Sequence, residues 1–251
     1  MLSITNLEKG FKNKEIFKSM SIQMDEGIYG FLGPNGAGKT TLIRCICGVY
    51  KFKKGEIALD GVKVGDKAYV DKLGYLPQSF GLFKDMKVSA ALDYMAGLKR
   101  VPKAMVQSEI DRVLRITNLS DRKNDRIRSL SGGMIRRLGI AQALLGDPKL
   151  LIFDEPTAGL DPEERIRFKK IIAGLSKDKI ILISTHICSD IEALCDKVMV
   201  IDGGRMLYNG SLEGLEEIGS KSDRAVEDGV SESMLERGYL CLLNKDAEGL
   251  A

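Results

Sequence analysis

A glycine-rich segment lies between a short apolar run and a helix-favouring stretch, and reads Gly33-Pro34-Asn35-Gly36-Ala37-Gly38-Lys39-Thr40. It fits the pattern GxxxxGK[ST], whose glycines let backbone N–H groups approach phosphate oxygens at the start of a helix. Lys39 is expected to hold the β- and γ-phosphates of a nucleotide, and the Thr40 hydroxyl to bind Mg²⁺. A glycine-rich turn could match by chance, but the strand before it and the helix after it favour a phosphate loop.

Two adjacent carboxylates, Asp154 and Glu155, end the apolar run 150–153. They would therefore lie at the tip of a buried strand. Asp154 suits Mg²⁺, usually through a water, because magnesium prefers oxygen ligands and keeps part of its hydration shell. Glu155 could polarise an attacking water. Many strands end in acidic residues, so the pair alone is weak evidence for a site. The phosphate loop in the same chain makes the functional interpretation strong.

A third segment, Leu130-Ser131-Gly132-Gly133-Met134, opens a stretch with apolar residues at helical spacing. Ser131 is a favourable N-cap residue, so a capped helix is the simplest interpretation. The alternative is a second anion-binding helix terminus, in which two glycines allow close backbone approach. Such a terminus would lie far from the first phosphate site of the same chain.

Composition is that of an ordinary globular protein: 251 residues, 44% hydrophobic, 29% charged, with a net charge of +3. The charge is near balance and argues neither for nor against nucleic acid or an anionic surface. The five cysteines and single histidine lack zinc-site spacing, so we interpret the cysteines as reduced core residues of a cytoplasmic protein. No secretion signal is visible, and no apolar run approaches the roughly 18 residues of a membrane helix.

The pattern along the chain predicts strands with one embedded helix over about the first 65 residues, including a hairpin at Asp60-Gly61. Residues 84–130 favour helices. The fully apolar runs 150–153 and 180–183, separated by a helix that starts at Pro162, predict a parallel sheet covered on both faces. A hairpin with a turn at Gly203-Gly204 follows. Beyond Gly210 the sequence is acidic, turn-rich and poorly patterned.

Taken in order, Lys39, Gln78, Ser131, Glu155 and His186 resemble the motif series of the ATP-binding subunit of an ABC transporter. The resemblance covers about residues 1–210. It implies an α/β fold: a P-loop NTPase, RecA-like core with an N-terminal antiparallel β subdomain and an inserted α-helical subdomain. We expect an ABC ATPase domain over residues 1–211, with the helical subdomain at about 84–135, and a C-terminal appendage of unknown role over 212–251.

The resemblance also implies that ATP and Mg²⁺ are sandwiched between two subunits. The phosphate loop, from Gly33 through Thr41, would hold the nucleotide on one copy, and Ser131, Gly132 and Gly133 would contact it from the other. Glu155, His186 and Lys39 would be the catalytic residues. In this assignment Glu155 orients a water, and His186 contacts the γ-phosphate.

The resemblance implies a role for three further residues from their place in the motif series, and each also has a simpler structural explanation. Gln78 resembles the loop glutamine that contacts Mg²⁺ or the water, and completes a metal set of Thr40, Gln78 and Asp154; alone it would be a polar loop residue. Asp161 resembles a residue that communicates across the dimer, although an αL turn before a helix also fits. Phe11 resembles the aromatic that stacks on adenine, with strand packing as the alternative and Phe17 as a competitor.

One residue departs from the family pattern. Met134 stands where a glutamine is common, and a thioether cannot make the polar contacts of an amide. Since Ser131 and both glycines are present, we expect phosphate sensing to survive. The intact Glu155 argues against a site that cannot hydrolyse ATP.

The resemblance therefore implies an ATP-binding and hydrolysing subunit of a bacterial exporter, which powers transport through ATP-driven dimerisation. Its partners would be a separate transmembrane permease and a second copy of itself or a homologous ATPase subunit, with no nucleic acid expected. It would attach through the permease to the inner face of the cell membrane. The assignment to exporters, as opposed to importers, rests on the resemblance of residues 75–78, 131–134 and 201–204 to exporter subunits.

Two other functions are compatible with a phosphate loop. A soluble ABC-type ATPase acting in translation, DNA repair or cofactor assembly is the main alternative. The interval from Gln78 to Ser131 is too short for the heptad-bearing arms of repair proteins, and translation relatives usually carry two motor domains per chain. A bare nucleotide-binding switch or a kinase would need neither the segment at Ser131 nor the distal Asp161.

Overall fold

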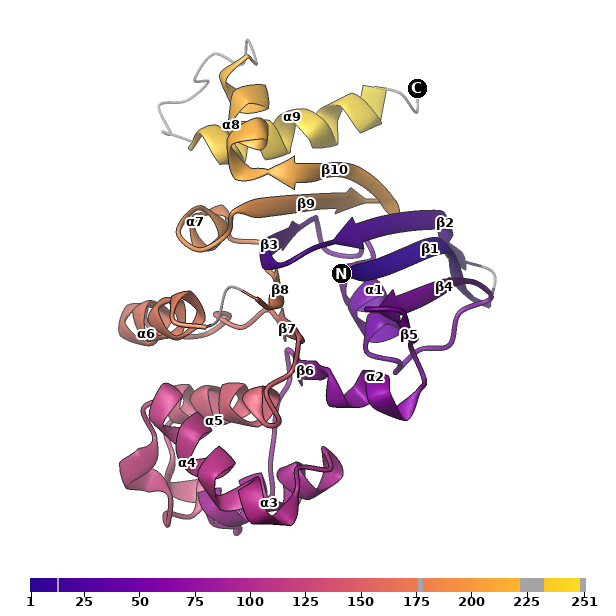
Figure 1. The fold of residues 1–251 in the computed structure, drawn as a ribbon. Helices are drawn as coiled ribbons and strands as arrows, with labels where there is room; N and C mark the ends of the chain where they lie inside the picture. The colour runs from indigo at the N-terminus through magenta and orange to yellow at the C-terminus, as the bar shows by residue number, and fades with distance from the viewer. Residues whose placement is uncertain (13, 176–177, 222–232, 249–251) are drawn as a thin grey trace.

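A computed structural model describes residues 1–12, 14–175, 178–221 and 233–248 of the chain (Figure 1). Its strands form two sheets. The first is antiparallel in the order β2-β1-β4-β5, with the bounds β1 Leu2–Phe11, β2 Lys14–Met24, β4 Lys54–Leu59 and β5 Val62–Lys63. The second has the order β10-β9-β3-β8-β7-β6, with the bounds β3 Gly27–Leu32, β6 Leu73–Leu76, β7 Leu150–Asp154, β8 Ile180–Ser184, β9 Lys197–Asp202 and β10 Arg205–Ser211.

The second sheet is the core of the molecule. Its strands β6, β7, β8, β3 and β9 run parallel, and β10 is added antiparallel at one edge. Every residue of β7 and β8 is buried, as the apolar runs predicted. Alternate side chains serve two cores: Ile152 packs toward α1 (Lys39–Ile46) and the antiparallel sheet, and Leu151 toward the helices on the other face.

Both predicted hairpins are present with two-residue turns. Asp60 and Gly61 have φ of 48° and 76°, and Gly203 and Gly204 have φ of 50° and 77°. Two consecutive left-handed residues are typical of the type I′ turn, whose twist matches that of the flanking strands. The second turn also approaches the phosphate loop, because Gly204 N–H donates to the Ala37 carbonyl at 3.0 Å.

Helices α3 (Val88–Leu98), α4 (Val106–Ile116) and α5 (Gly132–Leu144) form the helical part at the bottom of Figure 1. The predicted stripe of α4 is buried, with Ile110 and Val113 at 2% and 0% exposure. Helix α5 runs without interruption past residue 135 and packs against β6, where a Cβ on Gly139 would lie 2.6 Å from Leu76. The predicted subdomain boundary therefore falls inside a continuous helix.

Several elements were not predicted by the sequence pattern. Strand β6 and the short helix α2 (Lys67–Asp71) are two of them. Helix α7 (Cys188–Glu192), which follows β8, is another, whereas α6 (Pro162–Ala173) follows β7 and starts at Pro162 as predicted. The segment beyond Gly210, which is poor in pattern, contains α8 (Leu212–Ser220) and α9 (Met234–Glu248), which lie over β10 at the top of Figure 1. Residues 222–232 and 249–251 of the predicted appendage lie outside the described residues.

Helices α8 and α9 cross at two glycines. A Cβ on Gly219 would lie 2.0 Å from the Met234 carbonyl oxygen, and one on Gly238 would lie 2.1 Å from the Leu215 carbonyl oxygen. Leu215 and Leu235 are fully buried beside this crossing and join the main hydrophobic core. The helix pair is thus part of the packed structure, and its crossing needs residues without a side chain.

We therefore predict that Gly238→Ala lowers the free energy of unfolding by about 1–3 kcal/mol, because its methyl group would overpack the crossing. Gly97→Ala is the matched control: Gly97 is an exposed residue of α3 with no atom within 4 Å of an added Cβ. That control should gain about 0.5–1 kcal/mol from helix propensity. Urea denaturation followed by circular dichroism measures both, and equal stability of the two variants would contradict the close crossing.

Candidate functional site

The phosphate-loop segment connects β3 to α1 and leaves the start of that helix open. Gly38 occupies the N-cap with φ of 112°, and no side chain of the described residues caps the helix. The first backbone N–H groups of α1 are consequently available to an anion. Close packing also requires glycine at two positions of the loop. A Cβ on Gly33 would lie 2.3 Å from the Ile201 carbonyl oxygen, and one on Gly38 would lie 3.0 Å from the Phe17 ring.

A cavity of about 180 Å³ lies beside this loop. It collects residues from the loop, from the segment after β6 and from the end of β7, namely Ile16, Pro34, Asn35, Gly36, Gly38, Lys39, Thr40, Thr41, Gln78, Asp154 and Glu155. Residues separated by more than a hundred positions in the sequence thus share one small space. The predicted phosphate, metal and base residues of one chain are brought together there.

The Lys39 side chain is buried and folded onto its own loop. Its Nζ donates to the carbonyl oxygens of Gly33 and, at 3.2 Å, of Pro34. Burial lowers the pKa of Lys39, while the carboxylates of Glu155 and Asp154 oppose that effect. The ammonium group therefore lies within the loop, where a phosphate could replace the two carbonyls as its partner.

The two carboxylates are positioned by the neighbouring strand β8. Ser184 Oγ donates to Asp154 Oδ1 at 2.5 Å and accepts from the Glu155 backbone N–H at 3.1 Å. The same N–H lies 3.0 Å from the Ser184 carbonyl oxygen. Glu155 has φ of 47°, a left-handed conformation that is uncommon outside glycine and persists where neighbours hold it. This turn directs the Glu155 side chain to the cavity.

His186 lies at the end of β8 and contacts the candidate base. Its Nδ1 is 3.0 Å and 3.2 Å from the two carboxylate oxygens of Glu155. The side chain is 59% exposed and lies just outside the residues that line the cavity. A nucleotide in the cavity could therefore approach His186 from the solvent side.

The oxygen donors of the cavity suit magnesium. The Thr40 hydroxyl, the Gln78 amide oxygen and the Asp154 carboxylate all line it, and Mg²⁺ takes oxygen ligands while keeping several waters. The chemistry of these three residues therefore fits Mg²⁺, the ion that the sequence analysis predicted for them. The assignment itself stays a prediction.

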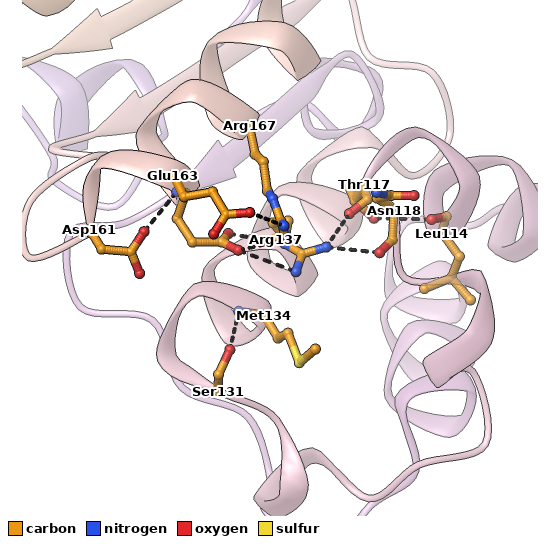
Figure 2. Close-up of polar contacts among 10 residues, drawn as sticks. Leu114, Thr117, Asn118, Ser131, Met134, Arg137, Asp161, Glu163 and Arg167 are labelled. Carbon is orange, nitrogen blue, oxygen red and sulfur yellow. Dashed lines mark hydrogen bonds and ion pairs between the residues drawn. The ribbon is translucent and has the colours of Figure 1, made fainter.

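The segment at Ser131 lies elsewhere and begins α5 (Figure 2). Ser131 caps the helix, its Oγ accepting from the Met134 N–H at 3.2 Å. Ser131 and Gly132 are exposed, and neither they nor Gly133 line the cavity. Packing also favours glycine at position 133, because an added Cβ would lie 2.5 Å from the Glu164 side chain. Met134, which stands where a glutamine is common, is partly buried and packs its side chain against the main hydrophobic core.

Asp161 is tied to the same region. It caps α6, accepting from the Glu164 N–H at 2.8 Å, and it also lies outside the cavity. Glu164 in turn pairs with buried Arg137 of α5 at 3.1 Å. Arg137 donates further to the carbonyls of Thr117 and Asn118. The two helix ends at Ser131 and Asp161 are thereby held as one rigid surface.

The two candidate aromatic residues have different environments. Phe11 is 42% exposed, meets Tyr50 edge-on with ring centroids 5.3 Å apart, and has Lys9 Nζ 4.3 Å from its ring. Phe17 is fully buried beneath Gly38. Phe17 is therefore unavailable for stacking, and Phe11 keeps an accessible ring although it does not line the cavity.

Three residues near the site were not identified from the sequence. Ile16 lines the cavity, Ser184 holds the Asp154 carboxylate and the Glu155 backbone N–H, and Arg136 binds backbone carbonyls around them. Ser184 could have been found from its position two residues before His186 at the end of an apolar strand. The sequence offers no local signal for Arg136, because its partners are remote in the chain.

Comparisons with known proteins agree with this architecture. A family model described as ABC transporter matches residues 17–158. The chain is 37% identical to the uncharacterised ABC transporter ATP-binding protein YxlF of Bacillus subtilis, over 86% of this chain and 73% of that protein. It is 35% identical to the Nod factor export ATP-binding protein I of Cupriavidus pinatubonensis, over 84% of this chain and 66% of that protein.

A solved structure described as the ATP-binding subunit of an ABC transporter superposes on 97% of this chain and 99% of its own, with a TM-score of 0.81 and 25% identity. The fold and the phosphate-loop site thus define an ABC-type ATPase. The chain belongs to the ABC transporter family and is an ATP-binding subunit. The family and fold class expected from the sequence are confirmed.

The two aromatic residues offer a test of the site. We predict that Phe11→Ala raises the Kd for ATP by about 5- to 150-fold, since base–aromatic stacking contributes about 1–3 kcal/mol. The folded state should be little affected, because the Phe11 ring is exposed. Phe17→Ala should instead lower the free energy of unfolding by about 3–5 kcal/mol. Calorimetric titration with ATP and thermal unfolding separate the two effects, and unchanged ATP affinity of Phe11→Ala would remove Phe11 from the site.

Proposed function

We propose that this chain binds Mg²⁺ and ATP in the phosphate-loop cavity and hydrolyses ATP in a head-to-tail pair with a second copy or a homologous subunit. One observation carries the proposal. Two of the helix termini in the described residues, at Gly38 and at Ser131, offer glycine backbone to a phosphate, and of these two the terminus at Gly38 lines the cavity. The exposed terminus at Ser131 is therefore free to contact the nucleotide of another copy.

The residues of the cavity divide the chemistry among them. The phosphate-loop N–H groups and Lys39 Nζ bind the phosphates, and Lys39 exchanges its loop carbonyls for phosphate oxygens. Thr40, Gln78 and Asp154 would hold Mg²⁺, which neutralises charge on the phosphates when bound. Glu155 accepts a hydrogen bond from a water and orients it for in-line attack on the γ-phosphate.

His186 and the second copy complete this arrangement. The contact between His186 Nδ1 and the Glu155 carboxylate restrains the base in its orientation. The helix terminus at Ser131 of the second copy would offer backbone N–H groups to the same γ-phosphate, where they stabilise developing charge. Hydrolysis removes that phosphate and weakens the pair, so ATP binding closes the dimer and hydrolysis opens it.

The work of this cycle is proposed to be transport, with a separate membrane permease as the partner. Within the part of the chain that the structure describes, no helix combines the length and the apolar character needed to cross a membrane. The similarity to a Nod factor export protein supports an exporter. We propose a cytoplasmic subunit held at the inner membrane face by its permease.

A groove next to Gln78 supports a docking site for the permease. It has a volume of about 450 Å³ and is lined mainly by apolar side chains, namely Phe80, Gly81, Leu82, Phe83, Met86, Ala91, Tyr94 and Met95. Phe83 is 72% exposed and Tyr94 is 54% exposed. Exposed apolar patches of this kind mark interaction sites, and this one adjoins the loop that reaches the cavity.

The catalytic proposal predicts a trapped complex. Glu155→Gln should bind ATP with a Kd within about twofold of wild type, lose about 100-fold or more in hydrolysis rate, and form a dimer with ATP and Mg²⁺. Glu56→Gln is the control, since Glu56 lies in a surface ion pair with Lys63. Light scattering after size-exclusion chromatography measures the mass. A Glu155→Gln protein that stays monomeric with ATP at high concentration would overturn the paired site.

The docking proposal predicts a separate loss. Phe83→Asp should weaken association with the co-purifying membrane protein by about 30-fold or more, as expected for a central apolar contact, and leave ATP affinity unchanged. Val49→Asp is the control, because Val49 is 60% exposed and lies outside the groove. Pull-down from detergent extracts measures association. If the wild-type chain instead captured ribosomes or DNA and was stimulated by them, the soluble alternative would be favoured.

A further inference from the structure

Arg136 makes an unusual set of contacts from the first turns of α5. Its Nε donates to the Pro156 carbonyl at 2.9 Å. Its Nη1 donates to the carbonyls of Pro77 at 3.1 Å and Gln78 at 2.9 Å. Its Nη2 donates to the carbonyls of Asp154, at 3.1 Å, and Glu155. A guanidinium group has five N–H donors, and all five are used on backbone oxygens.

These acceptors belong to the two segments that carry the candidate metal and base residues. Pro77 and Gln78 follow β6, and residues 154–156 end β7 and follow it. Because Arg136 uses only their carbonyl oxygens, the side chains of Gln78, Asp154 and Glu155 stay available to the cavity. One planar group thus fixes two loops without occupying the functional atoms.

The contact also restrains the conformation of Glu155. Its φ of 47° is unfavourable for a residue with a side chain and must be held by its surroundings. Ser184 holds the Glu155 N–H from β8, and Arg136 holds its carbonyl from α5. The backbone of the candidate base is therefore held at both its N–H and its carbonyl oxygen.

The adjacent arginine has different partners. Arg137 pairs with Glu164 of α6 and with the carbonyls of Thr117 and Asn118 (Figure 2). Its contacts stabilise the helical region and the start of α6. Arg136 is the residue of α5 that reaches the cavity loops, so the two arginines can be tested separately.

We propose that Arg136 is a positioning residue for ATP hydrolysis, which holds the backbone of Gln78 and Glu155 in fixed relation to the helix that begins at Ser131. The inference rests on the proposed function of the cavity. A displacement of α5 would move both loops together, because the guanidinium plane is rigid and is bonded to each. The arrangement thus links the surface that contacts a second copy to the base of the chain's own site.

The test uses the full-length chain with Arg136→Lys and Arg136→Gln. Lysine keeps the positive charge but has a compact ammonium group that cannot span five acceptors on two loops. We expect kcat to fall about tenfold or more in both variants, since small misplacement of a catalytic group is costly. KM for ATP and the Kd for Mg·ATPγS should stay within about threefold, because the binding atoms are unaltered.

Arg112→Lys is the matched control. Arg112 of α4 donates to the Leu144 carbonyl at 2.8 Å and pairs with Glu109, so it is a comparable tether remote from the cavity. It should lower the thermal midpoint while leaving kcat within about twofold of wild type. Hydrogen exchange on Arg136→Lys should show faster exchange in residues 73–78 and 150–156 than in the wild type, a readout that does not depend on activity. If Arg136→Gln does not fold, the lysine variant decides.

Several outcomes would overturn the positioning role. One is a kcat of Arg136→Lys equal to that of the wild type. Another is a loss of nucleotide affinity in the Arg136 variants as large as their loss of kcat. A third is a loss of kcat in Arg112→Lys as large as that in Arg136→Lys. A wild-type chain that binds Mg·ATP without hydrolysing it, alone and with its permease, would overturn the proposed function and this inference together. Wild-type hydrolysis with unaffected Arg136 variants would overturn the inference alone.

Discussion

The hydrogen-bonded pairing of three adjacent parallel strands, β3, β8 and β7, is the constraint on which the rest of the site depends. Phe31 of β3 and Asp154 of β7 both pair with Ser184 of β8, so the loops that follow these strands leave the sheet at one edge. The phosphate loop and the carboxylates meet there for this reason. Because side chains alternate along a strand, a slip of one residue between β7 and β8 would turn Asp154 to the other face.

A second level of organisation lies outside the sheet. Helix α5 begins at the exposed Ser131 terminus and is bonded through Arg137 to α6 and through Arg136 to the loops of the cavity. The surface proposed to meet a second copy is therefore not an independent module. Its ion pair and backbone contacts connect it to the candidate base within a few residues, and a contiguous set of contacts of this kind can carry coupling between two sites.

The same edge of the molecule connects the cavity to the apolar groove. Gln78 lines the cavity, and Phe80, two residues later, begins the groove and packs beside Gly139 of α5. A partner seated in the groove would press on the segment whose backbone Arg136 also holds. Nucleotide, helical region and docking surface thus share a short stretch of chain, and a change at one has a direct route to the others.

The sequence by itself determined the chemistry that depends on local spacing. The glycines before Lys39, the acids after an apolar run and the capped helix at Ser131 are readable because each involves neighbouring residues, and the family and fold class followed from their order. Only the tertiary structure decided which distant residues meet: that Ser184 holds Asp154, that Arg136 reaches two loops, that Gly133 faces Glu164, and that a segment of weak pattern packs as α8 and α9. Those contacts join positions remote in the chain, where the partner of a side chain depends on the fold and not on its neighbours in sequence.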